Sequence, residues 1–419
     1  MIGRTNAISA AGVELSLVVS VTSGASVVAT KGAKSVTGVS SGGSCTLKLP
    51  EAGTWSVTAT NGGQTSNTVT VNVVDSYSVA LTFFSATITV NVASGATVVC
   101  RKGTTTYTKT STGTAVFTVT ETGTWTIEAT SGGQTVSGTV NVVSGTTSYT
   151  ITLSFVSSTL NDNDWDVIRA VSDAGEGANY WSVGDRKSVV LNGTVGNLSL
   201  SNVTTYAFIL GFNHNASVEG SNRIHFQLAK SALTGGKDIC LVDSKYGSQV
   251  SSTNYFSMNS SRTNVGGWNG SQMRTNICGT SLSSYSGTII AVIPAALRSA
   301  LKSVTKYTNN KGGSSITASD ITATTDYFFL LAEKEVFGTI SSGSSLEENK
   351  QEQYAYYSAG NSKIKYKHNE TGDAANWWLR SPRAGGATAS SAFVIVYTDG
   401  TVVNGGASYS YGFAPGFCV

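Results

Sequence analysis

A repeat with a spacing of about 70 residues most constrains how this chain can fold. The blocks SGASVVATKG, EAGTWSVTATNGGQT and SYSVALTF within residues 23–83 return as SGATVVCRKG, ETGTWTIEATSGGQT and SYTITLSF within residues 94–155. Apolar and polar residues alternate along each copy, and turns recur about every ten positions, which is typical of short antiparallel strands. A period of this length exceeds that of solenoid repeats, so it predicts two small β-sandwiches in tandem.

Each copy contains one tryptophan at the same place, Trp55 or Trp125, and we interpret both as core residues of their sandwiches. We therefore expect immunoglobulin-like modules over residues 13–84 and 85–157, preceded by an N-terminal attachment segment over residues 1–12. A spacer role is favoured for the modules. Sugar binding by the modules is the alternative, but only strand and turn residues stand out in them.

Composition argues against several classes of protein. Of the 419 residues, 40% are hydrophobic and only 12% are charged, so the chain is not of the polar, highly charged type that stays disordered. The net charge is only +3 and neither part carries a basic stripe, which argues against nucleic-acid binding. No apolar run reaches the roughly 18 residues of a membrane span, so no membrane insertion is expected. The N-terminus lacks the pattern of a secretory signal, which favours synthesis in a bacterial cytoplasm.

After residue 157 the composition changes, and residues 158–419 are expected to form one α+β domain. A capped helix is predicted in NDNDWDVIRAVSDAG, and further helices are predicted at residues 271–279 and 294–308. Short strands are predicted at YAFILGF, TIIAVIP and DYFFLLA.

Residues that commonly bind metal ions are few and scattered. The histidines show no metal-ligand spacing: His214, His225 and His368. One stretch has the spacing of a calcium loop but lacks its turn glycine and final glutamate: Asp162, Asp164 and Asp166. The cysteines form no C-x-x-C pair and are interpreted as reduced, buried thiols: Cys45, Cys100, Cys240, Cys278 and Cys418. We therefore expect no metal ion and no cofactor.

The sequence does not assemble a catalytic constellation. It contains no G-x-S-x-G and no phosphate-binding loop. Glu333 and Glu335 form an acid pair two residues apart, which places them on different faces of a helix and favours solvated or ion-paired roles over catalysis. The tyrosines of residues 353–360 either stack against a ligand or pack between layers, and packing is favoured.

A series of motifs occurs in a fixed order after residue 160: WDVIRAVSDAG, ANYWSVGDRKSVVLNG, FILGFNHN, GSNRIHFQLAK, SVTKYT, FLLAEKEVFG, QYAYY, WWLRSP and GFAPGFCV. Over residues 160–419 this series resembles the C-type-lectin-fold variable proteins of diversity-generating retroelements, whose fold is related to that of formylglycine-generating enzymes. Members of this type occur on the tails of phages that infect gut bacteria. The opening MIGRTNA also resembles the start of phage tail proteins of Gram-positive hosts.

The resemblance implies that a retroelement rewrites codons at their adenines, which excludes Lys, Glu, Gln, Met and Trp from the diversified positions. Residues 383–419 contain none of these five types, although they fill 46 of the other 382 positions. Their absence supports a variable region at about residues 383–417. An ordinary closing hairpin is the alternative, because strands and turns contain few of these residues anyway.

The variable region is predicted to contain a hairpin that turns at Asp399-Gly400. Alternation along its first strand predicts two faces, one with Val394 and Val396 and the other with Phe393, Ile395 and Tyr397. Tyrosine, glycine and serine suit a contact surface, as in antibody paratopes. We expect the following display residues to bind the ligand: Arg383, Gly385, Gly386, Thr388, Ser390, Phe393, Ile395, Tyr397, Val403, Asn404, Gly405, Tyr409, Tyr411 and Phe413. The predicted frame residues, which hold the ends of this region to the core, are Trp377, Trp378, Arg380, Pro382, Pro415 and Phe417.

Together these features predict a non-catalytic receptor-binding protein of a phage tail, located in the virion. Its expected partners are a host cell-surface protein or glycan at the C-terminal face and other tail proteins at the N-terminus. The phage context alone favours a homo-oligomer, and among these a trimer. The alternatives are an adhesin on a bacterial cell surface and a sulfatase-modifying-type enzyme. The enzyme would need a reactive cysteine pair, and Cys240 and Cys278 could approach Cys418 only through folding.

Overall fold

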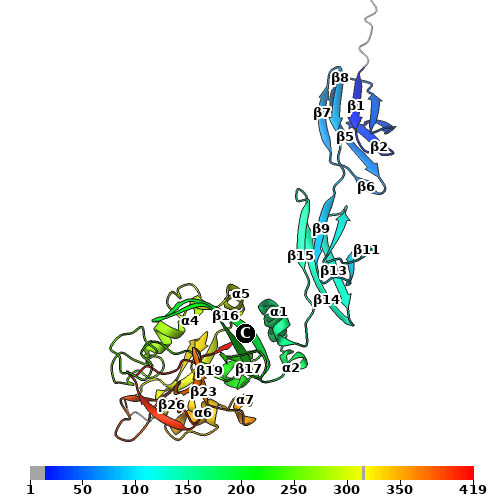
Figure 1. Ribbon diagram of the computed structural model, residues 1–419. Helices are drawn as coiled ribbons and strands as arrows, with labels where there is room; N and C mark the ends of the chain where they lie inside the picture. The colour runs from blue at the N-terminus through cyan, green and yellow to red at the C-terminus, as the bar shows by residue number, and fades with distance from the viewer. Residues whose placement is uncertain (1–14, 314–316) are drawn as a thin grey trace, which may run out of the picture. The chain divides into compact units, whose positions relative to one another are not determined.

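The computed structural model describes residues 15–313 and 317–419, so the predicted attachment segment at residues 1–12 lies outside the described residues (Figure 1). The chain divides after Phe155 into two compact units. Strands make up most of the regular structure in both units, so the protein is multidomain and mostly β. Within the described ranges, no helix has both the length and the apolar character needed to cross a membrane.

The first unit contains two sandwiches with the same strand plan. In the first, sheet β4-β1-β8 packs with sheet β3-β2-β5, whose strand β5 also pairs with β6 and β7. In the second, sheet β12-β9-β15 packs with sheet β11-β10-β13-β14. The first sandwich consists of β1 (Ser16–Ser20), β2 (Ser26–Lys31), β3 (Lys34–Val39), β4 (Ser44–Lys48), β5 (Gly53–Asn61), β6 (Gln64–Thr65), β7 (Val69–Val73) and β8 (Ser76–Ala80). The second consists of β9 (Ala86–Asn91), β10 (Thr97–Lys102), β11 (Thr105–Thr110), β12 (Thr114–Val119), β13 (Gly123–Ser131), β14 (Gln134–Val142) and β15 (Ser148–Thr152).

Each sandwich has its own hydrophobic core around the tryptophan of the repeat. Trp55 and Trp125 are fully buried at equivalent places on β5 and β13. Their ring N–H groups donate to the carbonyls of Glu51 and Glu121, at 3.2 and 3.1 Å. The repeat in sequence is therefore a repeat in packing and hydrogen bonding, and the interpretation of both tryptophans as core residues is confirmed.

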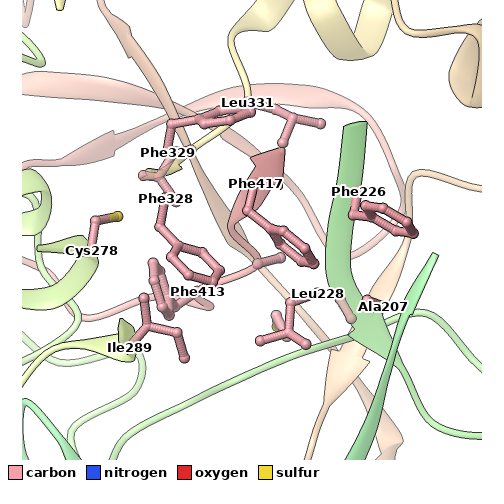
Figure 2. Packing of buried hydrophobic residues seen from close by; sticks show 14 of the residues in the cluster. Ala207, Phe226, Leu228, Cys278, Ile289, Phe328, Phe329, Leu331, Phe413 and Phe417 are labelled. Atoms are coloured by element: carbon pink, nitrogen blue, oxygen red, sulfur yellow. The ribbon is translucent and has the colours of Figure 1, made fainter. Parts of the chain in front are cut away.

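The C-terminal unit is built on a five-stranded sheet in the order β16-β17-β18-β28-β22. Its strands are β16 (Arg186–Val195), β17 (Leu198–Phe212), β18 (Ile224–Lys230), β22 (Phe328–Phe329) and β28 (Gly416–Cys418). Aromatic rings from three of them meet in the core, as Figure 2 shows. The Phe417 ring centroid lies 5.3 Å from that of Phe226 and 5.2 Å from that of Phe328. Residues near the end of the chain thus complete the centre of this unit.

Three smaller sheets and several short helices surround the main sheet. The sheets are β19 (Ile239–Cys240) with β23 (Lys365–Lys367) and β24 (Glu370–Ala375); β20 (Val304–Asn309) with β21 (Ile321–Asp326); and β25 (Trp377–Pro382) with β26 (Ala392–Val396) and β27 (Val402–Gly406). The α-helices are α1 (Trp165–Asp173), α2 (Gly177–Tyr180), α3 (Ala216–Glu219), α4 (Ile289–Val292), α5 (Ala295–Ala300), α6 (Glu333–Phe337) and α7 (Ala355–Ser358). Tighter or wider helical turns are η1 (Leu160–Asp162), η2 (Met273–Cys278), η3 (Ala318–Asp320) and η4 (Ser345–Lys350).

Several predicted elements of this unit are confirmed. Helix α1 begins after Asp164, as the capped-helix pattern predicts, although the Asp164 side chain makes no capping hydrogen bond. YAFILGF lies within β17. The helix predicted at residues 271–279 is the π-helical turn η2.

Other predicted elements are wrong in type or extent. The helix predicted over residues 294–308 ends at Ala300, and β20 follows because its threonines and Val304 suit a paired strand. TIIAVIP, predicted as a strand, contains helix α4, since a short buried apolar run has no period that separates helix from strand. DYFFLLA is not one strand: Asp326 ends β21, Phe328–Phe329 form the short strand β22, and the remaining residues lie outside strands.

Candidate functional site

The predicted hairpin is present near the C-terminus. Strands β26 and β27 pair antiparallel, with Val396 opposite Val402. The Tyr397 N–H donates to the carbonyl of Thr401 at 2.8 Å, and Gly400 has a φ of 86°, which favours glycine. The Asp399 carboxylate accepts from the Thr401 hydroxyl and N–H, and these bonds hold the pKa of Asp399 below its usual value. Local residues therefore specify the turn.

The predicted frame residues are all buried. The Trp377 ring N–H donates to the carbonyl of Lys363 at 2.9 Å, and the Trp378 ring N–H donates to the carbonyl of Phe256 at 2.8 Å. Phe417 pairs with Phe226 of β18 and Phe328 of β22 across the main sheet. The backbone on both sides of residues 383–414 is thus held by the core.

Arg380 lies at the centre of a buried group of charges, the charge network, whose members are Glu219, Lys306, Glu335, Tyr354 and Arg380. Arg380 donates two hydrogen bonds to the carboxylate of Glu335, at 2.6 and 2.7 Å. Lys306 Nζ lies 2.6 Å from Glu219 and 3.0 Å from Glu335. Although burial opposes it, the two cations hold the pKa of Glu335 well below its usual value. Burial raises the pKa of Glu219 to about 7.

This network corrects the predictions for the acidic pair. Glu333 and Glu335 are both fully buried rather than solvated, and only the ion-paired role of Glu335 is confirmed. The Glu333 carboxylate instead accepts backbone N–H groups from the loop after α6, at 2.6 to 3.2 Å: Ser341, Ser342 and Gly343. The tyrosines of residues 353–360 pack in the core, as predicted: Tyr354, Tyr356 and Tyr357.

Two histidines lie near this network: His214 and His225 come from the same stretch of chain as Glu219, whereas Glu335 comes from a distant one. The rings of His214 and His225 lie 5.5 Å apart, and His214, Glu219 and Glu335 offer possible ligand atoms within 4.8 Å of one another. Lys306 and Arg380 already supply two positive charges to the two carboxylates. The arrangement therefore has the chemistry of an ion-pair network rather than of a metal site. Burial lowers the pKa of His214 to about 3, so the ring is neutral at physiological pH.

Four predicted display residues are buried, so their assignment to the ligand-binding face is wrong: Phe393, Ile395, Gly405 and Phe413. Strand β26 is covered on both sides, because all five of its residues are buried. Alternation predicts an exposed face only when one side of a strand meets solvent. Phe413 packs against Phe256 in the core, with ring centroids 5.4 Å apart.

The other display residues reach the surface to different degrees. Tyr397 and Val403 remain 43% and 38% exposed. The glycines and serine of the loop before β26 are exposed: Gly385, Gly386 and Ser390. The remaining display residues are half-buried: Arg383, Thr388, Asn404, Tyr409 and Tyr411. These ten residues form the display face, which consists of the 383–391 loop, the β26–β27 hairpin and the segment after β27.

Two tyrosines of the display face rest on aromatic residues below them. The Tyr409 and Tyr411 rings are stacked, with centroids 6.0 Å apart. Tyr411 also lies 5.0 Å from Trp378 and 6.2 Å from Tyr246. Tyr409 is therefore placed by a rigid column of rings, and Tyr246 is a supporting residue that had no signal in the sequence.

Asn264 is the main residue that sequence reasoning missed. It is fully buried, and its side-chain amide donates to carbonyls at both ends of the 383–391 loop, at 3.4, 2.7 and 2.7 Å: Arg383, Ala389 and Ala392. Its backbone N–H donates to the carbonyl of Ser390 at 3.0 Å. Within the loop, Arg383 donates to the Thr388 hydroxyl. One side chain from outside the predicted variable region thus holds both ends of this loop.

The cysteines form no disulfide, and all five are buried. Cys418 lies 3.3 Å from Nδ1 of His225, and burial raises the pKa of its thiol to about 12. Burial likewise raises the pKa of Cys240 to about 12. A buried thiol that stays protonated is a poor nucleophile and a poor metal ligand.

Residues 238–419 match a family model described as a domain of unknown function (DUF6273), which covers the display face and the frame residues. Among curated proteins, none matches this chain. Solved structures with some similarity include GBS52, the minor pilin of Streptococcus agalactiae, at 11% identity and a TM-score of 0.23, covering 34% of this chain and 96% of the pilin. They also include the carbohydrate-binding module CBMbc of Eubacterium rectale Amy13K, solved with maltoheptaose, at 13% identity and a TM-score of 0.14, covering 34% of this chain and 94% of the module. These similarities are too distant to bear on function.

Proposed function

We propose that this chain is a non-catalytic receptor-binding protein of a phage tail. Its C-terminal unit would have a C-type-lectin fold whose display face is diversified by a retroelement and binds a host cell-surface protein or glycan. The two sandwiches would act as spacers, and other tail proteins would bind at the N-terminus. An adhesin on a bacterial cell surface is the alternative.

The observation that carries the proposal is the separation between a fixed frame and an exposed face. The frame residues are buried, whereas Tyr397, Val403 and Ser390 present exposed side chains to solvent. Exposed side chains on a fixed backbone can change with little effect on stability, because most surface substitutions cost less than about 0.5 kcal/mol. Such a face tolerates diversification at its exposed non-glycine positions, whereas the positive φ of Gly385 and Gly386 favours glycine.

The chemistry of the face also favours recognition over catalysis. Its aromatic and small residues suit non-covalent contact, in which tyrosine provides rigid area at a low entropy cost. The buried, protonated state of Cys418 and Cys240 argues against thiol chemistry of the sulfatase-modifying type.

The diversification is tested by the DNA around the gene. We expect a reverse-transcriptase gene and a template repeat that nearly matches the codons for residues 383–417 and differs from them only where the template has adenine. The absence of such a repeat, or differences spread over all four bases, would remove the retroelement from the proposal and leave the adhesin alternative.

Binding is tested with the purified chain on intact cells of a panel of gut bacteria, measured by flow cytometry. Tyr397→Ala combined with Tyr409→Ala should lower binding to the positive strain by about tenfold or more, since aromatic residues often dominate interface energies. Tyr77→Ala is a control, because Tyr77 is an exposed tyrosine (50%) in the first sandwich, comparable to Tyr397 (43%). Equal binding by both variants would contradict the assignment of the display face.

A further inference from the structure

A second candidate site lies in the C-terminal unit, outside the display face. It is a cavity of about 480 Å³, lined in part by Arg169, Asp173, Arg223, Lys302, Ser303 and Tyr327. All of its lining residues fall between 169 and 327, so none belongs to the predicted variable region. Helix α1, which contributes Arg169 and Asp173, and strand β26 of the hairpin lie on different sides of the unit (Figure 1).

The lining of this cavity is positively charged. Three cationic side chains face one carboxylate, which leaves a net charge of +2 (three minus one). Asp173 accepts from Arg169 at 2.9 Å and lies 2.6 Å from Lys302 Nζ, so its charge is already shared between two partners. Although only 12% of the residues of this protein are charged, three cationic side chains lie around this one cavity.

Backbone carbonyls help to hold both arginines in place, and Arg169 is also paired with Asp173. Arg169 Nη1 donates to the carbonyls of Ala300 and Leu301, and Arg223 Nε donates to the carbonyl of Glu219 at 2.8 Å. These bonds orient both guanidinium groups, and among the described residues Arg223 forms no ion pair, whereas Arg169 shares Asp173 with Lys302. Within the described parts of the chain, both terminal amino groups of Arg223 and Nη2 of Arg169 have no hydrogen-bond partner.

Lys302 differs from the arginines because its donors are already used. Its ammonium group donates to the Ser172 hydroxyl at 3.1 Å and to the carbonyl of Asn222 at 2.6 Å, besides the ion pair with Asp173. The groups left for a ligand are therefore the arginine N–H groups, and Ser303 and Tyr327 are further polar residues of the lining. A planar guanidinium with free N–H groups matches the two oxygens of a carboxylate, sulfate or phosphate.

We propose that this cavity binds an oxyanionic group carried by a molecule about the size of a monosaccharide, such as a sugar acid or a sugar phosphate. Arg223 and Arg169 donate to the anion, and the Ser303 and Tyr327 hydroxyls bind the remainder of the molecule. The volume exceeds what a bare ion would fill and lies within the range of small-molecule pockets. Because the site is separate from the display face, it does not depend on the function proposed above.

The test uses the full chain and isothermal titration calorimetry at constant ionic strength, with glucuronate, glucose 6-phosphate, inorganic phosphate and neutral glucose as probes. We expect saturable one-to-one binding of at least one sugar-borne anion and none of glucose. Binding of inorganic phosphate as tight as that of glucose 6-phosphate would still support an oxyanion site and would identify the bare ion as its ligand. Absence of saturable binding for all three anions would overturn the proposal.

Three variants distinguish the cavity from general charge attraction. Arg223→Gln should weaken anion binding by about tenfold, the effect of losing hydrogen bonds to a charged group. Ser303→Asp should abolish binding, because it adds a negative charge to the cavity without removing any hydrogen bond described above. Arg262→Gln removes the same charge from an exposed position outside the cavity and should change nothing. Equal losses of anion affinity in Arg262→Gln and Arg223→Gln would mean that only the net charge of the protein matters, and this would contradict the proposal.

Discussion

Single buried charges determine how the C-terminal unit responds to substitution and to pH. Arg380 and Glu335 are fully buried, where neither charge can be hydrated, so each depends on the other. Glu347 is also fully buried, but its partners are mostly uncharged: it accepts from the backbone N–H of Asn309 at 2.8 Å and from the Gln351 amide at 2.9 Å. The first pair stabilises the charged forms, whereas the environment of Glu347 favours the neutral form.

Glu335→Gln should destabilise the C-terminal unit by about 3–5 kcal/mol, because it leaves Arg380 buried without its carboxylate. The free energy of unfolding, measured by urea denaturation, checks this. Glu370→Gln is the control, since Glu370 is exposed and lies 3.7 Å from Lys367 in a pair that should contribute less than about 1 kcal/mol. Similar small losses in both variants would contradict a structural role for the charge network.

The pH dependence of stability should change in Glu347→Gln. Burial raises the pKa of Glu347 from 4.5 to about 7, so between these values the folded state holds a proton that the unfolded state has lost. The contribution of Glu347 to stability is therefore present at pH 4.5 and is lost as the pH rises through 7. The stability of Glu347→Gln relative to the unsubstituted chain should increase from pH 5 to pH 8.

Thermal melts of Glu347→Gln across this range measure the effect. The contribution of His214 to the pH dependence has the opposite sign, because its lowered pKa costs stability as the pH falls below 6.5. This contribution is the same in the variant and in the parent chain, so it cancels in their difference. Exposed Glu352→Gln should show no such trend. A constant difference between Glu347→Gln and the parent from pH 5 to 8 would mean that Glu347 is charged in the folded state throughout.

At the scale of elements, the 383–391 loop is a surface segment whose conformation is determined from beneath. Asn264 donates to carbonyls at both of its ends, which are the groups that a loop of glycines and alanines would otherwise leave to solvent. Variation at the exposed positions of the loop leaves these contacts unchanged, because Asn264 binds backbone atoms rather than side chains.

Asn264→Asp should loosen this loop, because a carboxylate cannot donate to the three carbonyls. We expect faster hydrogen exchange over residues 383–392 and a loss of about 1–3 kcal/mol from unsatisfied buried groups. Hydrogen–deuterium exchange with mass spectrometry localises the change. Asn369→Asp, at an exposed position, is the control. Unchanged hydrogen exchange in the loop would show that the hydrogen bonds from Asn264 are not needed to order it.

The hairpin and its frame could be predicted from sequence because their signals are local. Asp399-Gly400 specifies a turn, and the aromatic residues and prolines at both ends predict burial. The exposed positions could not be predicted, since all five residues of β26 are buried and the alternation of its side chains therefore marks no exposed face. The charge network and Asn264 had no local signal either, because their partners come together only in the folded chain.

For the whole molecule, the separate hydrophobic cores imply that the sandwiches and the C-terminal unit unfold independently. The cluster of the C-terminal unit contains no residue of the sandwiches, and each sandwich has a cluster of its own. The resemblance of the repeats in sequence therefore corresponds to structural units that do not depend on the C-terminal unit for their cores.

Trp125→Ala should cost the second sandwich about 3–5 kcal/mol and leave the melting of the C-terminal unit unchanged. Differential scanning calorimetry resolves the two transitions. Thr124→Ala, at the exposed neighbouring position, should have little effect on either. A parallel fall of both transitions would mean that the two units unfold together.

The place of β28 in the main sheet has a consequence for synthesis on the ribosome. His225 of β18 pairs with Cys418, which is 193 residues later in the chain. At a translation rate of about 5–20 residues per second, this partner is synthesised roughly 10 to 40 seconds after β18. The sandwiches can fold in that interval, but the apolar side of β18 has no complete sheet to join. The C-terminal unit is therefore the part of the nascent chain that would depend most on chaperones.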